Sequence, residues 1–319
     1  MSTPPPLGYL SASGARADII LPLTWYTLIV SVVVCVVIGA LLWQGVRRAA
    51  ARVTDLTTVP PQRGASGLSW IRVGVGISLV PLLVALVWTV VALGAASTPA
   101  GRPALVLDIT GHQWWWEVTY AADEAANTFT TANEIHIPVG APVLVRLHAA
   151  DVIHSFWVPK LTGKTDTIPG QTNLGWIQAR RAGHYRGQCT EYCGWQHAHM
   201  GLEIIADPPA EFARWRARQL QPAPQAVSDA ERHGRALLEF RCGSCHAVRG
   251  TTAGARSAPD LSHLAGRHLI GAAVLTNGAG ALGGWIENPQ GLKPGCLMPN
   301  QGLSVAELND VVAYLEKLQ

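Results

Sequence analysis

The stretch that decides the fold is residues 187–201, which read GQCTEYCGWQHAHMG. Two thiols, two imidazoles and a thioether lie in this short run, supplied by Cys189, Cys193, His197, His199 and Met200. Together they form a soft ligand set, which suits copper better than magnesium or calcium. Methionine is scarce, with three in the chain, and apart from the initiator and Met200 the remaining one is Met298. We therefore expect a soft-metal site in this stretch and a second site near Met298.

Composition narrows the class of protein. A chain of 319 residues allows two or three domains. Hydrophobic residues make up 49% and charged residues 14%, a balance that favours a membrane protein. The net charge of +3 is small and no basic run with interleaved aromatics is present, so we exclude nucleic-acid binding.

Two apolar runs predict a membrane hairpin. After a polar leader at residues 1–20, the runs at 21–43 and 73–93 each have about the 20 residues needed to cross a bilayer core, within a hairpin at 21–95. A cleaved signal peptide is the alternative for the first run, but the run is long and lacks a clear small-x-small cleavage site. Four arginines near the connection place it in the cytoplasm and the rest of the chain outside: Arg47, Arg48, Arg52 and Arg63.

The next two segments have different patterns. Between 104 and 207, short β-like runs separated by Gly and Pro predict an antiparallel sandwich or barrel, in a domain at 96–220 that ends with a short helix. Residues 221–227 indicate a proline-stiffened linker. Residues 228–319 contain two capping-box patterns, which predict helices, but this unit is small enough to need a cofactor in its core.

The first site can be assembled as a dinuclear copper centre. The thiolates of Cys189 and Cys193 would bridge two copper ions, and the imidazoles of His154 and His197 would bind at the two ends. The Met200 thioether would be a weak ligand to one ion, and the Glu191 backbone carbonyl a weak ligand to the other. Two alternatives are a disulfide between the cysteines, in an oxidising compartment, and a tetrahedral zinc, which has no use for Met200. We expect His199 to lie at the surface or behind the ligands.

The second site is the run CGSCH at residues 242–246, which is the pattern for covalent haem c attachment. Cys242 and Cys245 would bind the haem vinyl groups and His246 the iron, with Met298 as the second axial ligand. His263 and His268 are rival axial ligands. A thioredoxin-like C-x-x-C is disfavoured because no βαβ pattern surrounds it.

These motifs resemble a known family. The cysteine loop, together with GHQWWW at 111–116, ADVIHS at 150–155 and KTDTIPG at 164–170, resembles the dinuclear copper domain of cytochrome c oxidase subunit II. The resemblance implies a cupredoxin-like Greek-key barrel anchored by two membrane helices. It also implies that electrons enter through Trp114 and that the Glu191 side chain helps to bind magnesium at a subunit interface. The alternative for Trp114 is an ordinary aromatic of the barrel surface or core.

Residues 258–261 (APDL) and 293–299 (KPGCLMP) resemble class I cytochrome c, an all-α fold. A subunit II with a fused cytochrome c resembles the caa-type oxidases. This resemblance implies an electron-input subunit in a bacterial inner membrane, with its copper and haem domains in the periplasm. The implied partners are the catalytic subunit I, subunit III, membrane lipid, and a donor such as a quinol:cytochrome c reductase or a cytochrome c.

Three other functions remain open on the residues alone. One is a membrane-anchored redox shuttle without an oxidase partner. Another is a quinol oxidase subunit, which shares the barrel but lacks the copper ligands that this chain retains. The last is a zinc-stapled adhesion domain without redox activity.

Overall fold

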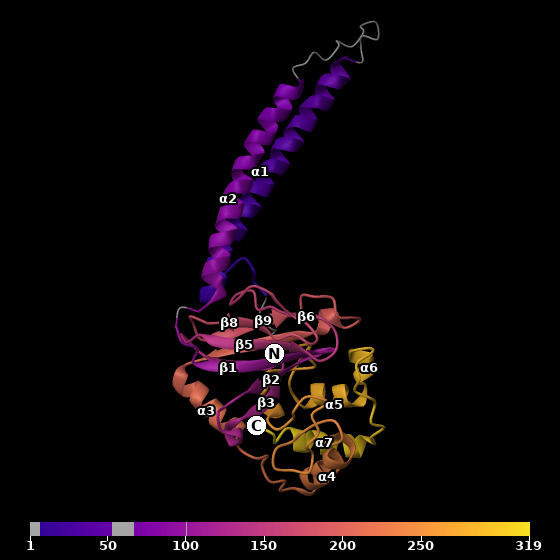
Figure 1. Cartoon of the computed structure of the whole chain (residues 1–319). Helices are drawn as coiled ribbons and strands as arrows, with labels where there is room; N and C mark the ends of the chain where they lie inside the picture. The colour runs from indigo at the N-terminus through magenta and orange to yellow at the C-terminus, as the bar shows by residue number, and fades with distance from the viewer. Residues whose placement is uncertain (1–6, 53–66, 100) are drawn as a thin grey trace. The chain divides into compact units, whose positions relative to one another are not determined.

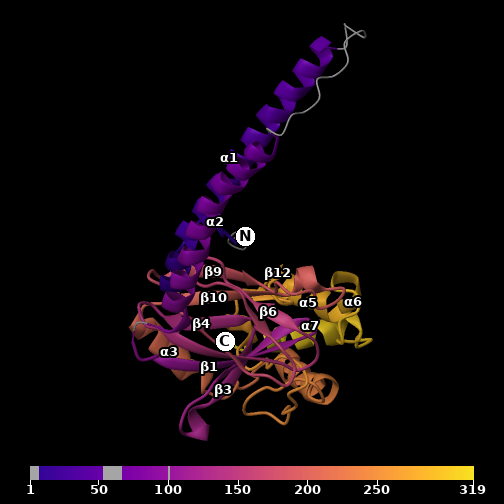
Figure 2. The ribbon, with the colours of Figure 1, turned by 45° about the horizontal axis from the view of Figure 1, so that its top comes forward.

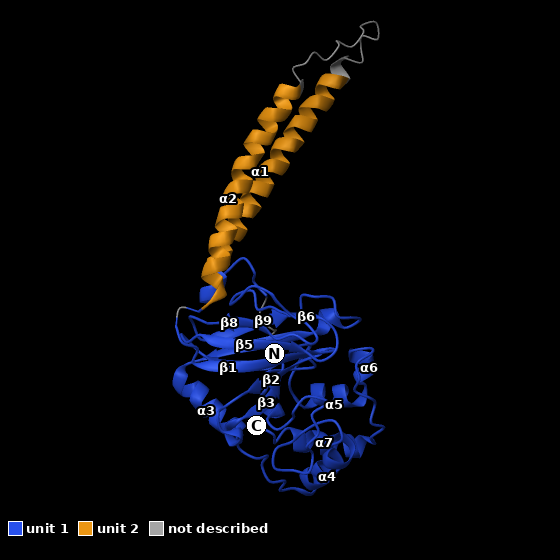
Figure 3. Ribbon diagram, in the orientation of Figure 1, with its two compact units in different colours: residues 1–17, 99–319 blue, residues 18–98 orange. Residues whose placement is uncertain are grey.

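The structure is a computed structural model that describes residues 7–52, 67–99 and 101–319. The chain divides into two compact units, Asp18–Thr98 and a second unit formed by Met1–Ala17 with Pro99–Gln319 (Figure 3). Most of the expected cytoplasmic connection, including Arg63, and the start of the expected leader lie outside the described residues.

The smaller unit consists of most of α1 (Ala15–Arg52) together with α2 (Gly67–Ser97). Both helices are long and apolar enough to cross a membrane, judged by length and composition. At its C-terminal end, α1 extends beyond its apolar run into a segment of alanine and arginine, which are good helix formers. The Tyr26 hydroxyl donates to the Pro81 carbonyl oxygen at 3.0 Å, and the Tyr26 ring lies 5.6 Å from that of Trp88.

The β domain of the larger unit contains two main sheets and a small ribbon (Figures 1 and 2). The larger sheet has the order β3-β2-β1-β5-β8 and the smaller one β4-β10-β9. The strands are β1 (Leu105–His112), β2 (Trp115–Tyr120), β3 (Phe129–Ala132), β4 (Glu134–Pro138), β5 (Val143–Ala149), β8 (Asn173–Ile177), β9 (Gly183–Gln188) and β10 (Gly201–Asp207). The ribbon pairs β6 (His154–Phe156) with β7 (Thr165–Thr167), and α3 (Pro209–Gln219) follows β10.

The sheets are mixed rather than purely antiparallel, which corrects that part of the expectation. β1 pairs with β5 in parallel, and β4 pairs with β10 in parallel. A parallel neighbour becomes possible because the chain passes through β4 of the other sheet before it returns as β5. Residues of β1 alternate between buried and half-buried, so one face of this strand supplies the core.

The C-terminal domain is mainly helical. Its helices are α4 (Asp229–Leu237), α5 (Ala279–Glu287), α6 (Pro289–Leu292) and α7 (Val305–Leu315), and β11 (Leu269–Ile270) pairs with β12 (Leu275–Thr276) in a short ladder. Both predicted capping boxes are formed, by Ser228 with Glu231 and by Ser304 with Glu307. Gly234 permits the close crossing of α4 and α7, because a Cβ there would lie 1.9 Å from the Asp310 carbonyl oxygen.

Hydrogen bonds join the β domain to the helical domain within the larger unit. The Arg249 guanidinium donates to the Thr128 carbonyl oxygen at 3.0 Å, and the Gly201 N–H donates to the Ala272 carbonyl oxygen at 3.0 Å. In the expected linker, the Ala223 N–H donates to the Arg249 carbonyl oxygen at 2.8 Å. The linker therefore packs against the helical domain, while the exact domain boundaries stay a prediction.

Candidate copper and haem sites

Strand ends bring the predicted copper ligands together. His154 opens β6, Cys189 directly follows β9, and Met200 directly precedes β10. Potential ligand atoms of His154, Cys189 and Cys193 all lie within 4.8 Å of one another, and all three residues are buried. β9 pairs with β10 in antiparallel register with Gln188 opposite Gly201, so residues 189–200 form a loop whose two ends lie side by side.

The two sulfurs occupy the middle of the cluster. Cys189 Sγ lies 3.8 Å from Cys193 Sγ, far beyond the bond length of about 2.05 Å in a disulfide. Cys193 Sγ is also 3.5 Å from His197 Nδ1 and 3.8 Å from Met200 Sδ. On the other side, Cys189 Sγ is 3.3 Å from the carbonyl oxygen of Glu191. The disulfide alternative is therefore not formed, and three further predicted donors lie around the two sulfurs.

His154 supplies the sixth donor through a specific ring nitrogen. Its Nε2 lies 2.7 Å from Asp151 Oδ1 and donates to that carboxylate, which leaves the lone pair on Nδ1. Nδ1 is buried and has no hydrogen-bond partner among the described residues. A buried, unsatisfied nitrogen is costly unless something binds it, so this atom is suited to a metal ion.

The donor set fits copper better than zinc. Hydrogen bonding from the Cys193 thiol holds the pKa of Cys189 well below its usual range, and the same hydrogen bond raises the pKa of Cys193, so the two sulfurs share one proton in the metal-free site. A structural zinc takes four ligands in a tetrahedron. Six donors converge here, including a thioether and a carbonyl, and this number and type of ligand favour copper.

Two residues around the loop take other positions. His199 is exposed, with Nδ1 2.6 Å from Gln196 Oε1, as expected for a histidine outside the ligand shell. The Glu191 carboxylate lies 3.7 Å from Lys164 Nζ and is partly exposed. Its role in magnesium binding stays a prediction.

Trp114 contacts the cysteine loop (residues 189–200, called the copper loop below) directly. Its indole Nε1 donates to the Cys193 carbonyl oxygen at 2.9 Å, and Gln113 Nε2 donates to the same oxygen at 2.8 Å. The Trp114 carbonyl oxygen accepts a 2.7 Å hydrogen bond from Lys293 Nζ. Lys293 is 4% exposed, and burial lowers its pKa to about 8. Trp114 therefore joins the copper loop to residue 293 of the helical domain.

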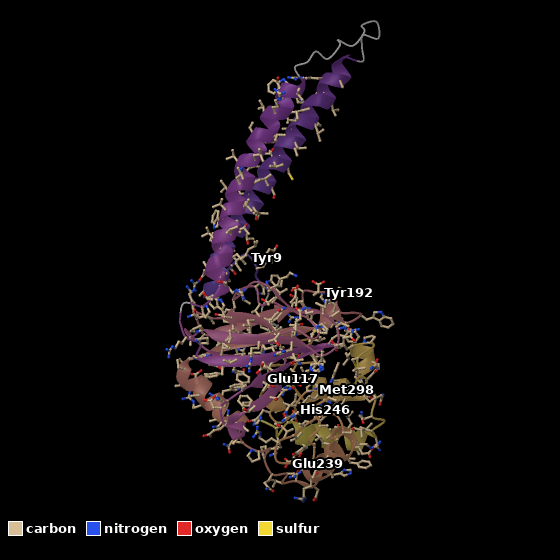
Figure 4. All side chains as sticks on the ribbon, viewed as in Figure 1. Tyr9, Glu117, Tyr192, Glu239, His246 and Met298 are labelled. Carbon is tan, nitrogen blue, oxygen red and sulfur yellow. The ribbon has the colours of Figure 1, made fainter. Side chains whose placement is uncertain are left out.

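The haem motif lies in the helical domain, where His246 and Met298 are labelled in Figure 4. His246 Nδ1 donates to the Pro259 carbonyl oxygen at 2.7 Å, which orients the ring and leaves Nε2 for iron. Burial lowers the pKa of His246, which favours the neutral form that binds a metal. Cys242 is half-buried, Cys245 is exposed, and Met298 packs against the domain core. The types of these residues are those of a covalent haem c with His and Met ligands, and the pairing of His246 with Met298 stays a prediction.

The rival axial ligands make other contacts. His268 Nδ1 lies 3.0 Å from Glu203 Oε2 of the β domain. His263 lines a cavity of about 280 Å³ together with Trp215 and Arg267. Met298 thus remains our predicted axial ligand.

Three further residues support these sites, and the sequence motifs gave none of them a role: Asp151, Pro259 and Lys293. Asp151 could have been noticed, because a carboxylate three positions before a predicted ligand histidine is a common orienting partner. Pro259 acts through its backbone carbonyl and Lys293 through a contact between domains. No local sequence pattern predicts either of these contacts.

Asp151→Asn is expected to weaken copper retention by about 10- to 100-fold, because the carboxylate fixes the His154 ring. Its Oδ2 also accepts the Gln113 N–H at 2.6 Å. Copper per chain after dialysis against graded chelator measures the effect. Asp108→Asn is the matched control, since Asp108 pairs with Arg146 in the same domain. Equal copper retention in the two variants would contradict the orienting role.

Comparisons with known proteins agree with the two predicted domains. Residues 105–206 match the family model described as "Cytochrome C oxidase subunit II, periplasmic domain", and residues 231–319 match "Cytochrome c". Cytochrome c oxidase subunit 2 of Alkalihalophilus pseudofirmus is 37% identical over 221 residues, covering 69% of this chain and 63% of that protein. The Bacillus subtilis protein of the same name is 31% identical over 228 residues, with coverages of 68% and 63%.

Among solved structures, the periplasmic domain of subunit II of cytochrome oxidase from Bradyrhizobium japonicum is 32% identical, with a TM-score of 0.35. The match covers 38% of this chain and 96% of the Bradyrhizobium japonicum chain. The alignments span 63% of the length of both curated relatives named above.

The predicted fold class, with an apolar helical hairpin, a cupredoxin-like β domain and a helical cytochrome c domain, is confirmed. The two domain types imply that the chain binds copper and haem c. The chain thus joins a domain that matches the periplasmic-domain model of cytochrome c oxidase subunit II to a C-terminal domain that matches the cytochrome c model.

Proposed function

We propose that this chain is the electron-input subunit of a caa-type haem-copper terminal oxidase. Electrons enter at a covalent haem c, pass to a dinuclear copper centre and leave for the haem of a separate catalytic subunit. That subunit reduces oxygen to water and couples the reaction to proton translocation. When bound, the haem and the copper pair supply one-electron redox chemistry.

The proposed ligands are those that the sequence predicts. The copper pair is held by His154, Cys189, the Glu191 carbonyl, Cys193, His197 and Met200. The haem is attached to Cys242 and Cys245, and its iron is ligated by His246 and Met298. The Glu191 side chain contributes to a magnesium site at the interface with the catalytic subunit.

One connected series of contacts carries the proposal. Lys293 Nζ donates to the Trp114 carbonyl oxygen at 2.7 Å, and Trp114 Nε1 donates to the Cys193 carbonyl oxygen at 2.9 Å. A Cβ on Gly295 would lie 3.7 Å from the Trp114 ring, so the segment that leads to Met298 packs against that ring. The tryptophan therefore links the segment of the proposed haem ligand to a proposed copper ligand. Tethering within one chain keeps the two sites at high effective concentration.

The proposed setting follows from the hairpin and the family. Two apolar helices anchor the chain in a bacterial inner membrane, with the copper and haem domains in the periplasm. The proposed partners are the catalytic subunit I, subunit III, membrane lipid, and a quinol:cytochrome c reductase or a cytochrome c as donor.

The test uses the complex isolated from its own membrane in mild detergent. After flash reduction of haem c, we expect rapid copper reduction followed by reduction of a partner haem. Trp114→Phe removes the indole donor to Cys193 and should slow the first step by at least about tenfold, the effect of a barrier higher by about 1.4 kcal/mol. Trp115→Phe is the control, because that ring stacks on His112 instead. Equal rates in the two variants would refute the role of Trp114, and the lack of a partner haem would favour a stand-alone shuttle.

A further inference from the structure

A second group of possible metal ligands lies where the two domains of the larger unit meet, apart from the predicted copper and haem ligands. It consists of His184 on β9, Glu203 on β10 and His268, which directly precedes β11. His184 Nδ1 is 3.2 Å from Glu203 Oε1, and His268 Nδ1 is 3.0 Å from Glu203 Oε2. The two imidazole rings lie 5.3 Å apart at an angle of 67°. The β domain thus supplies two of the three groups and the cytochrome c domain the third.

Burial within this group is uneven. The Glu203 side chain is 1% exposed, whereas those of His184 and His268 are 46% and 27% exposed. A carboxylate this deeply buried requires partners for both oxygens, and the two histidines occupy those positions. The histidine side is open to solvent, so an ion can reach the carboxylate without unfolding of the protein.

The nitrogen and oxygen atoms lie close enough for one ion to contact all three residues. One potential ligand atom from each residue lies within 4.8 Å of those of the other two, and the two nitrogen–oxygen separations are 3.0 and 3.2 Å. Two donors bound tetrahedrally to zinc, each about 2.0–2.1 Å from the ion, lie about 3.3 Å apart, so small side-chain movements would bring the group into that arrangement. Two imidazoles with one carboxylate form a ligand set for zinc and similar divalent ions, with a water as the fourth ligand.

The surroundings of the group hold its members in place. The His268 N–H donates to Glu134 Oε2 at 2.7 Å, which fixes the backbone of this residue against β4. Arg186, opposite Glu203 in the β9–β10 register, directs Nη1 to the Ala273 carbonyl oxygen at 3.3 Å. Hydrogen bonds therefore position the backbone around the cluster from both domains.

We propose that His184, Glu203 and His268 bind a divalent transition-metal ion that clamps the cytochrome c domain to the copper domain. When a neutral histidine binds the ion through Nδ1, the proton on that nitrogen passes to solvent and Nε2 of the same ring takes one up, so the imidazole stays neutral and no redox change is involved. An ion that binds only the docked arrangement, present at 100 times its dissociation constant, raises the ratio of docked to undocked molecules by about 100-fold.

The test is a zinc titration of the full chain in detergent, loaded with copper and haem, in competition with a chromophoric chelator. We expect one zinc per chain beyond the copper, with unchanged copper and haem spectra. His184→Ala and His268→Ala should each weaken zinc binding by at least about tenfold, because loss of a direct ligand costs no less than loss of an outer-shell partner. His233→Ala is the control, since His233 is 54% exposed and pairs with Asp310 elsewhere in the domain.

A second measurement tests the clamp itself. Zinc should slow amide hydrogen exchange around β11 in the wild type and in the His233→Ala variant, but not in His184→Ala. Equal zinc affinity in the wild type and His184→Ala would show adventitious binding and overturn the proposal. Zinc binding no tighter than millimolar in the wild type would also overturn it, leaving the group as hydrogen-bonded histidines alone.

Discussion

Replacing Cys193 with serine is expected to abolish the near-infrared copper absorption of this protein while the haem spectrum stays intact. Cys193 Sγ lies 3.8 Å from both Cys189 Sγ and Met200 Sδ and 3.5 Å from His197 Nδ1, so it contacts three of the other proposed ligands at once. A serine hydroxyl stays protonated at neutral pH and is a hard ligand, so it cannot act as a bridging thiolate.

Elemental analysis and optical spectra measure this effect. We expect copper to fall from the two ions per chain of the proposed centre to fewer than one, with one haem retained. Cys35→Ser is the matched control, because Cys35 is an exposed thiol on α1. A Cys193→Ser protein that still held two copper ions would refute the proposed centre, and a wild type that held zinc in their place would do the same.

Met298→Ala is expected to lower the reduction potential of the haem by on the order of 100 mV, within the roughly 0.8 V range that axial ligands cover. A thioether ligand favours ferrous iron, so its loss stabilises the oxidised state. The Met298 side chain packs against the domain core, and Gln290 Nε2 donates to the Met298 backbone carbonyl oxygen at 3.0 Å, which holds this segment of backbone.

A potentiometric titration followed at the haem bands provides the measurement. Leu297→Ala is the control, because the neighbouring Leu297 is 87% exposed. An unchanged potential in Met298→Ala would assign the axial position to His263 or His268 instead. His263→Ala and His268→Ala would then separate those two residues.

Tertiary contacts distinguish the roles of two histidines, His268 and His154, that the sequence offers as metal ligands. His268 was a rival haem ligand on the sequence alone, yet its Nδ1 lies against a buried carboxylate of the other domain. His154 was placed in the copper site by its motif, but only the structure shows which ring nitrogen is left for a metal. Both outcomes depend on which strand ends and loops pack against one another.

The sequence by itself determined the fold class, with its apolar hairpin, cupredoxin-like β domain and helical cytochrome c domain. These features show in local patterns, namely the apolar runs, the short β-like runs with turn residues, and the C-x-x-C-H motif. The tertiary structure alone decided the parallel strand pairs, the contact of Lys293 with Trp114 and the histidine cluster around Glu203. Such contacts join residues far apart in the chain, and only sheet pairing and domain packing fix the distances between them.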